Sequence, residues 1–277
     1  MINVGFFNRK GDIMKWILLA TLLVLLYYRA HKNTYHPKTN HIDLKLRQKT
    51  NPINILHLSD FHMEKISISP ESLYTSLKDN EIDIIALTGD YLERFKNVNK
   101  FVDYLNVLNQ LNPKYGIYVV FGNHDYLLRK QIDRFQKVIE DTGAIVLRNE
   151  NRVINIDGQK VNIIGIDDFK TKRSDLEKSY EGITDGINLV LTHDPNVVIH
   201  MKDYYYDYLL CGHFHGGQIH WPKPYHLVKM GELARENVIK GLNFYYDKPF
   251  YISEGLGQTA LNIRLRSRPE ITLHNLS

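Results

Sequence analysis

The chain has 277 residues, of which 43% are hydrophobic and 24% are charged, and its formal net charge is +4. This length suits one large domain or two small ones, and the apolar content excludes a globally disordered protein. The one cysteine, Cys211, excludes an intramolecular disulfide and cysteine-rich zinc modules, and we expect it to be a small core residue.

The positive charge is concentrated at the N-terminus. Residues 1–50 contain nine Lys and Arg against two Asp, whereas the remainder contains 26 basic and 29 acidic residues. The main part of the chain is therefore nearly neutral, and no specific nucleic-acid partner is expected. The basic excess flanks an apolar segment, where it is suited to contact anionic lipid.

That apolar segment, residues 16–28, has no charged side chain and lies between Lys15 and Arg29. As a helix it would be about 20 Å long, shorter than the roughly 30 Å hydrocarbon core of a bilayer. A span becomes feasible when the flanking Lys and Arg extend their charges to the interface. We expect an uncleaved membrane anchor over residues 1–28. A cleaved signal peptide and a buried soluble helix remain alternatives, and the side of the cell membrane stays open.

Residues 29–52 are polar and basic, which predicts a tether, and residues 53–277 are expected to form one domain. Strand patterns at 53–58, 82–87 and 116–121 alternate with helix patterns at 71–78, 98–111 and 128–141. Short apolar runs follow at 144–147, 153–156, 161–166, 187–191, 208–211, 250–253 and 271–273, with hairpin turns expected at 149–151 and 157–158. This order predicts an α/β (mixed α+β) protein with two packed mixed β-sheets and helices outside.

Five short polar segments each follow an apolar run that predicts a strand. They are Asp60-Phe61-His62, Gly89-Asp90, Gly122-Asn123-His124-Asp125, His193-Asp194 and Gly212-His213-Phe214-His215. Loops beyond the carboxyl ends of strands commonly form binding sites. The segments supply seven candidate ligands: Asp60, His62, Asp90, Asn123, His193, His213 and His215. Mixed carboxylate, amide and imidazole donors suit two divalent transition-metal ions and hydrolysis of a phosphate ester.

In type and order, these segments resemble the calcineurin-like metallophosphoesterase superfamily, whose pattern is D-x-H, G-D, G-N-H-D/E, H and G-H-x-H. The resemblance covers roughly residues 53–275. The run from Gly212 to Ile219, with residues 255–257 and 268–271, is similar to the membrane-anchored bacterial branch. The resemblance to the superfamily implies a four-layer αββα sandwich.

The resemblance also implies roles for individual residues. Asp60, His62 and His215 would bind one metal ion, Asn123, His193 and His213 the other, and Asp90 would bridge the two. His124 would be the general acid or contact the phosphate, and Asp125 would orient its imidazole, although Asp125 could instead cap a helix. A hydroxide between the ions would attack phosphorus in line. The ions could be Mn, Fe, Zn or Co, because selectivity depends on availability and geometry.

The expected function is hydrolysis of a phosphodiester, phosphomonoester or pyrophosphate at the membrane, and a lipid- or envelope-linked phosphoester is one candidate substrate. The alternatives are a non-catalytic membrane-anchored scaffold and a hydrolase of a non-phosphate bond. Among the other histidines, His57 is expected in the core and His274 in a polar tail, and a role at the lip of the substrate site is one alternative for His220 and His226. Glu93 occupies the position of the tyrosine in purple acid phosphatases, so a ferric tyrosinate site is not expected.

Overall fold

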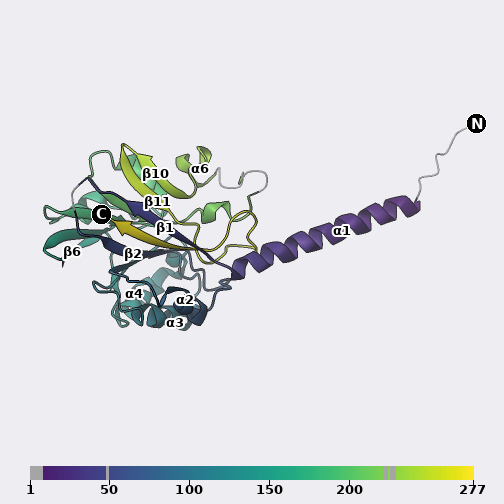
Figure 1. Ribbon diagram of the computed structural model, residues 1–277, viewed down its shortest axis with the longest axis horizontal. Coiled ribbons are helices and arrows are strands. Elements are labelled where there is room, and N and C mark those ends of the chain that lie inside the picture. The colour runs from purple at the N-terminus through teal and green to yellow at the C-terminus, as the bar shows by residue number, and fades with distance from the viewer. Residues whose placement is uncertain (1–8, 48–49, 221–223, 225–228) are drawn as a thin grey trace, which may run out of the picture.

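The computed structural model describes residues 9–47, 50–220, 224 and 229–277. Two six-stranded mixed sheets form the body (Figure 1). The first sheet contains, in spatial order, β1 (Lys38–Leu44), β12 (Glu270–Leu276), β2 (Ile53–Leu58), β3 (Ile84–Thr88), β4 (Ile117–Val120) and β5 (Ile145–Val146). The second contains β10 (Gly241–Tyr245), β11 (Lys248–Ile252), β9 (Tyr208–Cys211), β8 (Ile187–Leu191), β7 (Gln159–Gly165) and β6 (Glu150–Ile156).

Helices cover the outer faces of both sheets. Those beside the first sheet are α2 (Pro70–Leu77), α3 (Val98–Asn109) and α4 (Ile132–Glu140), and the second sheet carries the short helices α5 (Leu176–Tyr180) and α6 (Glu232–Arg235). Short 3-10 helices are η1 (Asn33–Tyr35), η2 (Phe95–Asn97), η3 (Asp125–Gln131), η4 (Pro195–His200) and η5 (His215–Gly217). Local signals explain several boundaries: the Ser69 side chain caps α2 by accepting from the Ser72 N–H, and Pro70 occupies the first turn.

Three apolar layers separate these elements. One lies between α2–α4 and the first sheet, one between the two sheets, and one between the second sheet and its outer segments. Helix α3 contributes Phe101, Leu105 and Leu108 to the first layer, as their spacing predicts. The four-layer αββα sandwich is therefore confirmed.

Parallel pairing brings the polar segments together. Strands β2, β3 and β4 are parallel neighbours in the first sheet, and β7, β8 and β9 are parallel neighbours in the second. Strands β3, β4, β8 and β9 are buried along their whole length, as is usual for parallel strands covered on both faces. Since the carboxyl ends of these strands lie at the same end of their sheets, the five segments meet in one place.

Of the two hairpin turns expected in the middle of the chain, the structure contradicts one and confirms the other. The hairpin turn expected at 149–151 is wrong, because β5 belongs to the first sheet and β6 to the second, so this stretch crosses between sheets. The turn at 157–158 is confirmed: it joins antiparallel β6 and β7, and Asp157 and Gly158 have φ values of 48° and 88°.

The basic segment 29–52 is not a simple polar tether. Helix α1 (Arg9–Lys32) continues into it, and β1 then pairs in parallel with β12 from Lys38↔Glu270 to Leu44↔Leu276. The pairing partner lies more than 200 residues away, and mostly polar edge strands such as β1 give little local signal. Strand β10, a short edge strand of the second sheet, was not expected either.

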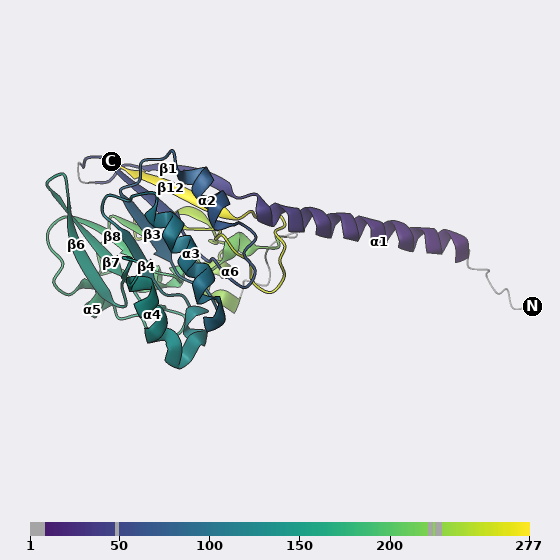
Figure 2. The same ribbon diagram turned by 90° about the horizontal axis from the view of Figure 1, so that it is seen from below.

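Helix α1 projects away from the body (Figures 1 and 2). Over Ile13–Tyr35 its length and composition are sufficient to cross a membrane. Its apolar side chains are exposed, including Trp16 at 69% and Leu22 at 62%, whereas Ala30 at the C-terminal end is only 2% exposed. A helix that packs in a soluble core would bury such side chains.

Candidate metal centre

Six of the seven predicted ligands form two compact groups. Asp60, His62 and His215 make the first, and Asp90, His193 and His213 make the second. Within each group, one ligand atom per residue lies within 4.8 Å of the others, so each group could hold a metal ion. All six residues are at most 5% exposed. Buried carboxylates and imidazoles gathered this closely are typical of sites that coordinate metals.

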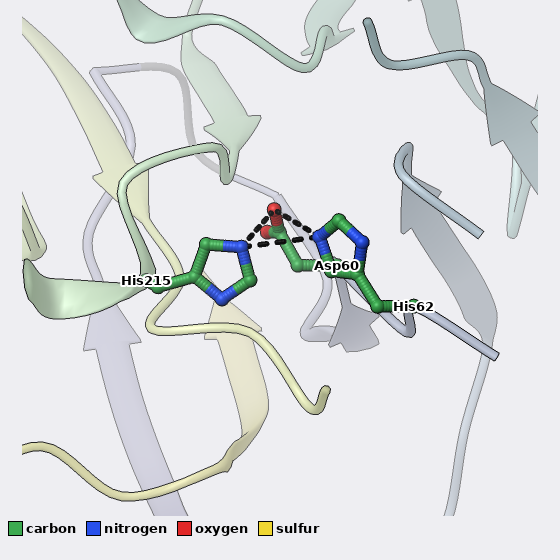
Figure 3. A group of neighbouring side chains, drawn as sticks. All are labelled: Asp60, His62 and His215. Carbon is green, nitrogen blue, oxygen red and sulfur yellow. Dashed lines mark hydrogen bonds and ion pairs between the residues drawn. The ribbon is translucent and has the colours of Figure 1, made fainter. Parts of the chain in front are cut away.

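In the first group the donor atoms face one another (Figure 3). His215 Nε2 lies 3.3 Å from Asp60 Oδ1 and 3.2 Å from His62 Nε2. The other oxygen of Asp60, Oδ2, accepts from Ser59 Oγ at 2.7 Å and from the His213 backbone N–H at 3.1 Å. These bonds fix the carboxylate and leave Oδ1 directed toward the two imidazoles.

The backbone around this group has unusual torsions. Asp60, His62 and His215 have φ values of 52°, 46° and 51°, in the left-handed region that non-glycine residues rarely adopt. Such strain persists where the surrounding structure enforces it, and it is concentrated at functional sites. Here the tight turns direct two side chains from one segment toward the same point.

In the second group, His193 Nε2 lies 3.1 Å from Asp90 Oδ2 and 3.2 Å from His213 Nδ1. His193 Nδ1 lies 2.7 Å from the Thr88 carbonyl, to which it donates. A backbone carbonyl bound in this way fixes the orientation of a ligating histidine and leaves Nε2 for the metal.

Asp90 lies between the two groups. Its Oδ2 is 3.7 Å from His62 Nε2 as well as 3.1 Å from His193 Nε2. The seventh predicted ligand, Asn123, has a buried Oδ1 without a hydrogen-bond partner in the described part of the chain. Leaving a buried acceptor unsatisfied costs about 1–3 kcal/mol, and a cation would remove that cost. The residues present therefore fit a pair of divalent cations.

The protonation of these groups follows from burial and from their partners. Burial lowers the pKa of His62 to about 3 and holds the pKa values of His213 and His215 well below the usual range. Burial acts to lower the pKa of His193 too, but the charge and hydrogen bond of Asp90, together with the charges of Asp60 and Asp168, outweigh burial and raise that pKa well above its usual range. Three imidazoles are thus already neutral at pH 7, the form that binds metal.

His124 lies at the edge of the site, with its side chain 27% exposed and Nε2 4.0 Å from Asp90 Oδ2. Its Nδ1 lies 2.9 Å from Glu93 Oε1, and His62, Glu93 and His124 form a further cluster. The expectation that Asp125 orients the imidazole is wrong, because Glu93 makes that contact. Glu93 was missed, although its place three residues after Asp90 in a loop of the site is a usable signal.

Asp125 instead organises the loops beneath the site. Its carboxylate accepts the backbone N–H groups of four residues at 2.8–3.2 Å, namely Asp90, Tyr91, Leu92 and Gly122. Burial raises the pKa of Asp125 to about 8 despite these bonds. The residue thereby joins the Gly-Asp loop to the Gly-Asn-His-Asp loop.

Arg264 is a second residue that the sequence did not indicate. It is fully buried and donates to the carbonyls of His215, Glu254, Gly255 and Gly257 at 2.6–3.0 Å. Burial lowers its pKa to about 10, so the guanidinium remains charged at neutral pH. Through these hydrogen bonds Arg264 holds the backbone of the loop that carries His215.

The remaining expectations are met in part. His57 is buried and bonds Thr88 Oγ1 at 2.8 Å, as expected for a core histidine, and Cys211 is a buried free thiol. The placement of His274 in a polar tail is wrong, because it lies in β12, is 1% exposed and contacts the Tyr208 hydroxyl at 2.9 Å. His226, for which a role at the lip of the site was one alternative, lies outside the described residues.

An open cavity of about 620 Å³ adjoins the second group of ligands. Four cationic side chains line it, Lys170, Lys172, Lys229 and Arg235, together with Glu232 and Asp194. Lys170 Nζ lies 3.4 Å from Nε2 of the predicted ligand His213, so the cavity opens directly beside the candidate metal site.

Comparison with known proteins agrees with this site. The family model for calcineurin-like phosphoesterase matches residues 53–217. The uncharacterized metallophosphoesterase YkoQ of Bacillus subtilis (strain 168) is 54% identical over 267 residues, which cover 94% of this chain and 99% of that protein. The phosphodiesterase YaeI of Escherichia coli (strain K12) is 28% identical over 234 residues, covering 81% of this chain and 82% of that protein.

A third relative is the UDP-2,3-diacylglucosamine pyrophosphatase LpxG of Chlamydia muridarum (strain MoPn / Nigg), 26% identical over 292 residues, with coverage of 85% and 88%. The match to the family model spans more than half of the chain. The chain therefore belongs to the calcineurin-like phosphoesterase family. It is a metal-dependent phosphoester hydrolase.

Proposed function

We propose that this protein is a dinuclear metallophosphoesterase that cleaves a phosphodiester or pyrophosphate at a membrane surface. The observation that carries this proposal is the position of Asp90 between two buried groups of ligands, within 3.1 Å of His193 and 3.7 Å of His62. Asp60, His62 and His215 would hold one ion, Asn123, His193 and His213 the other, and Asp90 would contact both. Bound divalent ions supply a deprotonated water near neutral pH and neutralise phosphate oxygens.

His124 and Glu93 are placed to act on the leaving group. His124 reaches the edge of the site with Nε2 directed toward Asp90, and its Nδ1 is held by Glu93 at 2.9 Å. A histidine held by a carboxylate keeps one ring nitrogen fixed while the other exchanges a proton with the substrate. In this proposal His124 donates to the leaving oxygen, and Glu93 is a positioning residue.

The basic cavity beside His213 supports a substrate with a second anionic group. Lys170, Lys172, Lys229 and Arg235 provide four positive charges around that space. The Chlamydia muridarum relative is named as a pyrophosphatase of a diacylated nucleotide sugar, and the Escherichia coli relative as a phosphodiesterase. The first name is consistent with a substrate that carries a negative charge on each side of the cleaved bond, whereas a phosphodiester carries its charge on the attacked phosphate alone.

The membrane location rests on α1. Its apolar residues are exposed along a helix that projects from the body, and its length and composition are sufficient to cross a membrane. A signal sequence would also meet these criteria, and the mass of the protein isolated from its host distinguishes the two. The proposal expects the mature protein to retain α1.

Hydrolysis is tested with the full chain in nonionic detergent and Mn²⁺, with bis(p-nitrophenyl) phosphate as substrate. We expect turnover by the native chain, a loss of metal and activity for Asp90→Ala, and a loss of activity with metal retained for His124→Ala. The matched control is His41→Ala, an exposed histidine on the edge strand β1. Two bound ions per chain without turnover of any phosphoester would leave the alternative of a non-catalytic scaffold.

A further inference from the structure

A second basic cavity lies at the point where α1 meets the body. Its volume is about 610 Å³. Five cationic side chains line it: Arg29, Lys38, Lys240, Arg266 and Arg268. Among the described residues of the lining, Glu254 is the one carboxylate, and Lys240 Nζ lies 3.1 Å from its Oε1. The cavity therefore carries a strong net positive charge, which favours an anionic ligand.

The cationic residues come from segments that are distant in sequence. Arg29 is in the last turn of α1, Lys38 begins β1, and Arg266 and Arg268 are in the loop before β12. The fold brings them together: the Lys38 N–H donates to the Pro269 carbonyl, and Arg268 Nε donates to the His36 carbonyl at 2.8 Å. The charge cluster is thus a built feature of the folded chain, in which Arg29 and Lys38 from residues 1–50 meet Lys240, Arg266 and Arg268 from the C-terminal part.

The cavity also lies at the depth of a membrane surface. The uncharged stretch of α1 ends at Tyr28, one residue before Arg29, and Leu26 on the preceding turn lines the cavity together with Leu265. If α1 spans a bilayer, residues 13–28 lie within or near the hydrocarbon, and the five cations lie at the level of the phosphates. Basic clusters beside a membrane-spanning helix attract anionic lipids.

We propose that this cavity binds the phosphate headgroup of an anionic phospholipid. The cations contact the phosphate, and Leu26 and Leu265 contact the first carbons of the acyl chains. A free phosphate ion would use the same charges but would gain nothing from the leucines or from the neighbouring bilayer. The inference rests on the membrane location given under the proposed function and is independent of hydrolysis.

The test uses the full chain in nonionic detergent, with binding of dioctanoyl phosphatidylglycerol followed by native mass spectrometry. We expect saturable binding of this lipid and little binding of dioctanoyl phosphatidylcholine, which has no net charge. Arg29→Gln/Lys38→Gln removes two exposed cations whose side chains make no hydrogen bond within the described part of the chain. The affinity for phosphatidylglycerol should fall roughly 30-fold, from about 1 kcal/mol per cation near an anionic surface.

The matched control is Lys137→Gln/Lys160→Gln, which removes two exposed lysines from α4 and β7 and should bind as the native chain does. The single change Arg29→Gln, which disturbs the fold least, should show about a fivefold loss. Glycerol 1-phosphate and inorganic phosphate are added as competitors. Competition by either one as effective as that by the lipid would make this a soluble-anion site and overturn the inference.

Flotation with vesicles of phosphatidylcholine alone separates the two proposals. A chain that fails to float contradicts the membrane location itself. Two outcomes would overturn the headgroup site for a chain that floats: equal binding of both dioctanoyl lipids, or a control variant that loses as much affinity as Arg29→Gln/Lys38→Gln. Both outcomes would leave the membrane location intact.

Discussion

Glu270 provides a sharp test of the electrostatics of the core. It begins β12, is 2% exposed, and accepts from the Tyr251 hydroxyl at 3.0 Å and the Thr272 hydroxyl at 2.7 Å. Burial raises its pKa from an ordinary value of 4.5 to about 7. Between these two pH values the folded chain keeps a proton that the unfolded chain has released. Stability therefore falls as pH rises through this window.

The size of this effect follows from the two pKa values. From pH 5 to pH 8, Glu270 alone should lower the free energy of unfolding by about 2.5 kcal/mol. The change Glu270→Gln keeps an acceptor for both hydroxyls and removes the ionisation. We therefore compare the free energy of unfolding of the variant with that of the native chain at each pH. The difference should favour the variant by about 2.5 kcal/mol more at pH 8 than at pH 5.

The measurement is urea unfolding of the full chain in nonionic detergent at both pH values, followed by the near-ultraviolet circular dichroism of tyrosine. Other buried groups also titrate in this range, but they are common to both proteins and cancel in the comparison. The control Glu177→Gln alters an exposed carboxylate on α5 and should leave the pH dependence unchanged. Parallel pH profiles for Glu270→Gln and the native chain would refute the reasoning, because Glu270 would then ionise normally in the fold.

Three further predictions concern the candidate site. Removing metal with a chelator should abolish hydrolysis and lower the melting temperature, since an ion at 100 times its Kd stabilises the folded protein by about 2.7 kcal/mol. Adding Mn²⁺ should restore both the activity and the melting temperature. An unchanged melting temperature after chelation would count against a bound ion. The change Glu93→Gln should lower kcat about 10- to 100-fold with bound metal unchanged, because the group orients His124; metal loss measured by elemental analysis would instead make Glu93 a ligand. The change Gly212→Ala introduces a Cβ that collides with Ser59 Oγ and Asp60 Oδ2. It should lower metal content and cost about 1–3 kcal/mol of stability, so full metal occupancy at native stability would contradict the packing at this position.

Much of the fold and the convergence of the ligands could be predicted from the sequence, because the signals are local. A buried apolar run followed by a polar segment marks the carboxyl end of a strand, and Asp60, Asp90 and His193 each follow such a run. Parallel pairing then places these ends together. The resemblance to a known family supplied the order of the segments, and the structure brings the same residues within 4.8 Å of one another in each group.

The supporting residues could not be predicted in the same way. Glu93 lies three residues after Asp90, which places it near the site, but its contact with His124 depends on the arrangement of the two loops that Asp125 joins. Arg264 lies in an irregular stretch between β11 and β12 without a hydrophobic period. Residues of this kind act through contacts between segments distant in sequence, so their roles depend on the tertiary structure.

The boundary between α1 and the body shows most clearly what such long-range contacts do. The Ala30 carbonyl accepts from the Arg264 N–H at 2.8 Å, His31 Nδ1 lies 2.8 Å from the Asn262 carbonyl, and Asn33 Nδ2 donates to the Arg264 carbonyl at 2.9 Å. A truncation that removes residues 1–50 would delete these contacts together with β1 and expose the edge of β12.

The same contacts connect the helix to the site. The Arg264 backbone N–H donates to the Ala30 carbonyl near the end of α1, and the Arg264 guanidinium donates to the carbonyl of His215 at 2.9 Å. Since the contacts involve consecutive turns at the end of α1 and a fully buried arginine, the body cannot rotate freely about the helix axis. A chain anchored through α1 would therefore present its metal centre to the membrane surface at a fixed angle, which a flexible tether over residues 29–52 would not do.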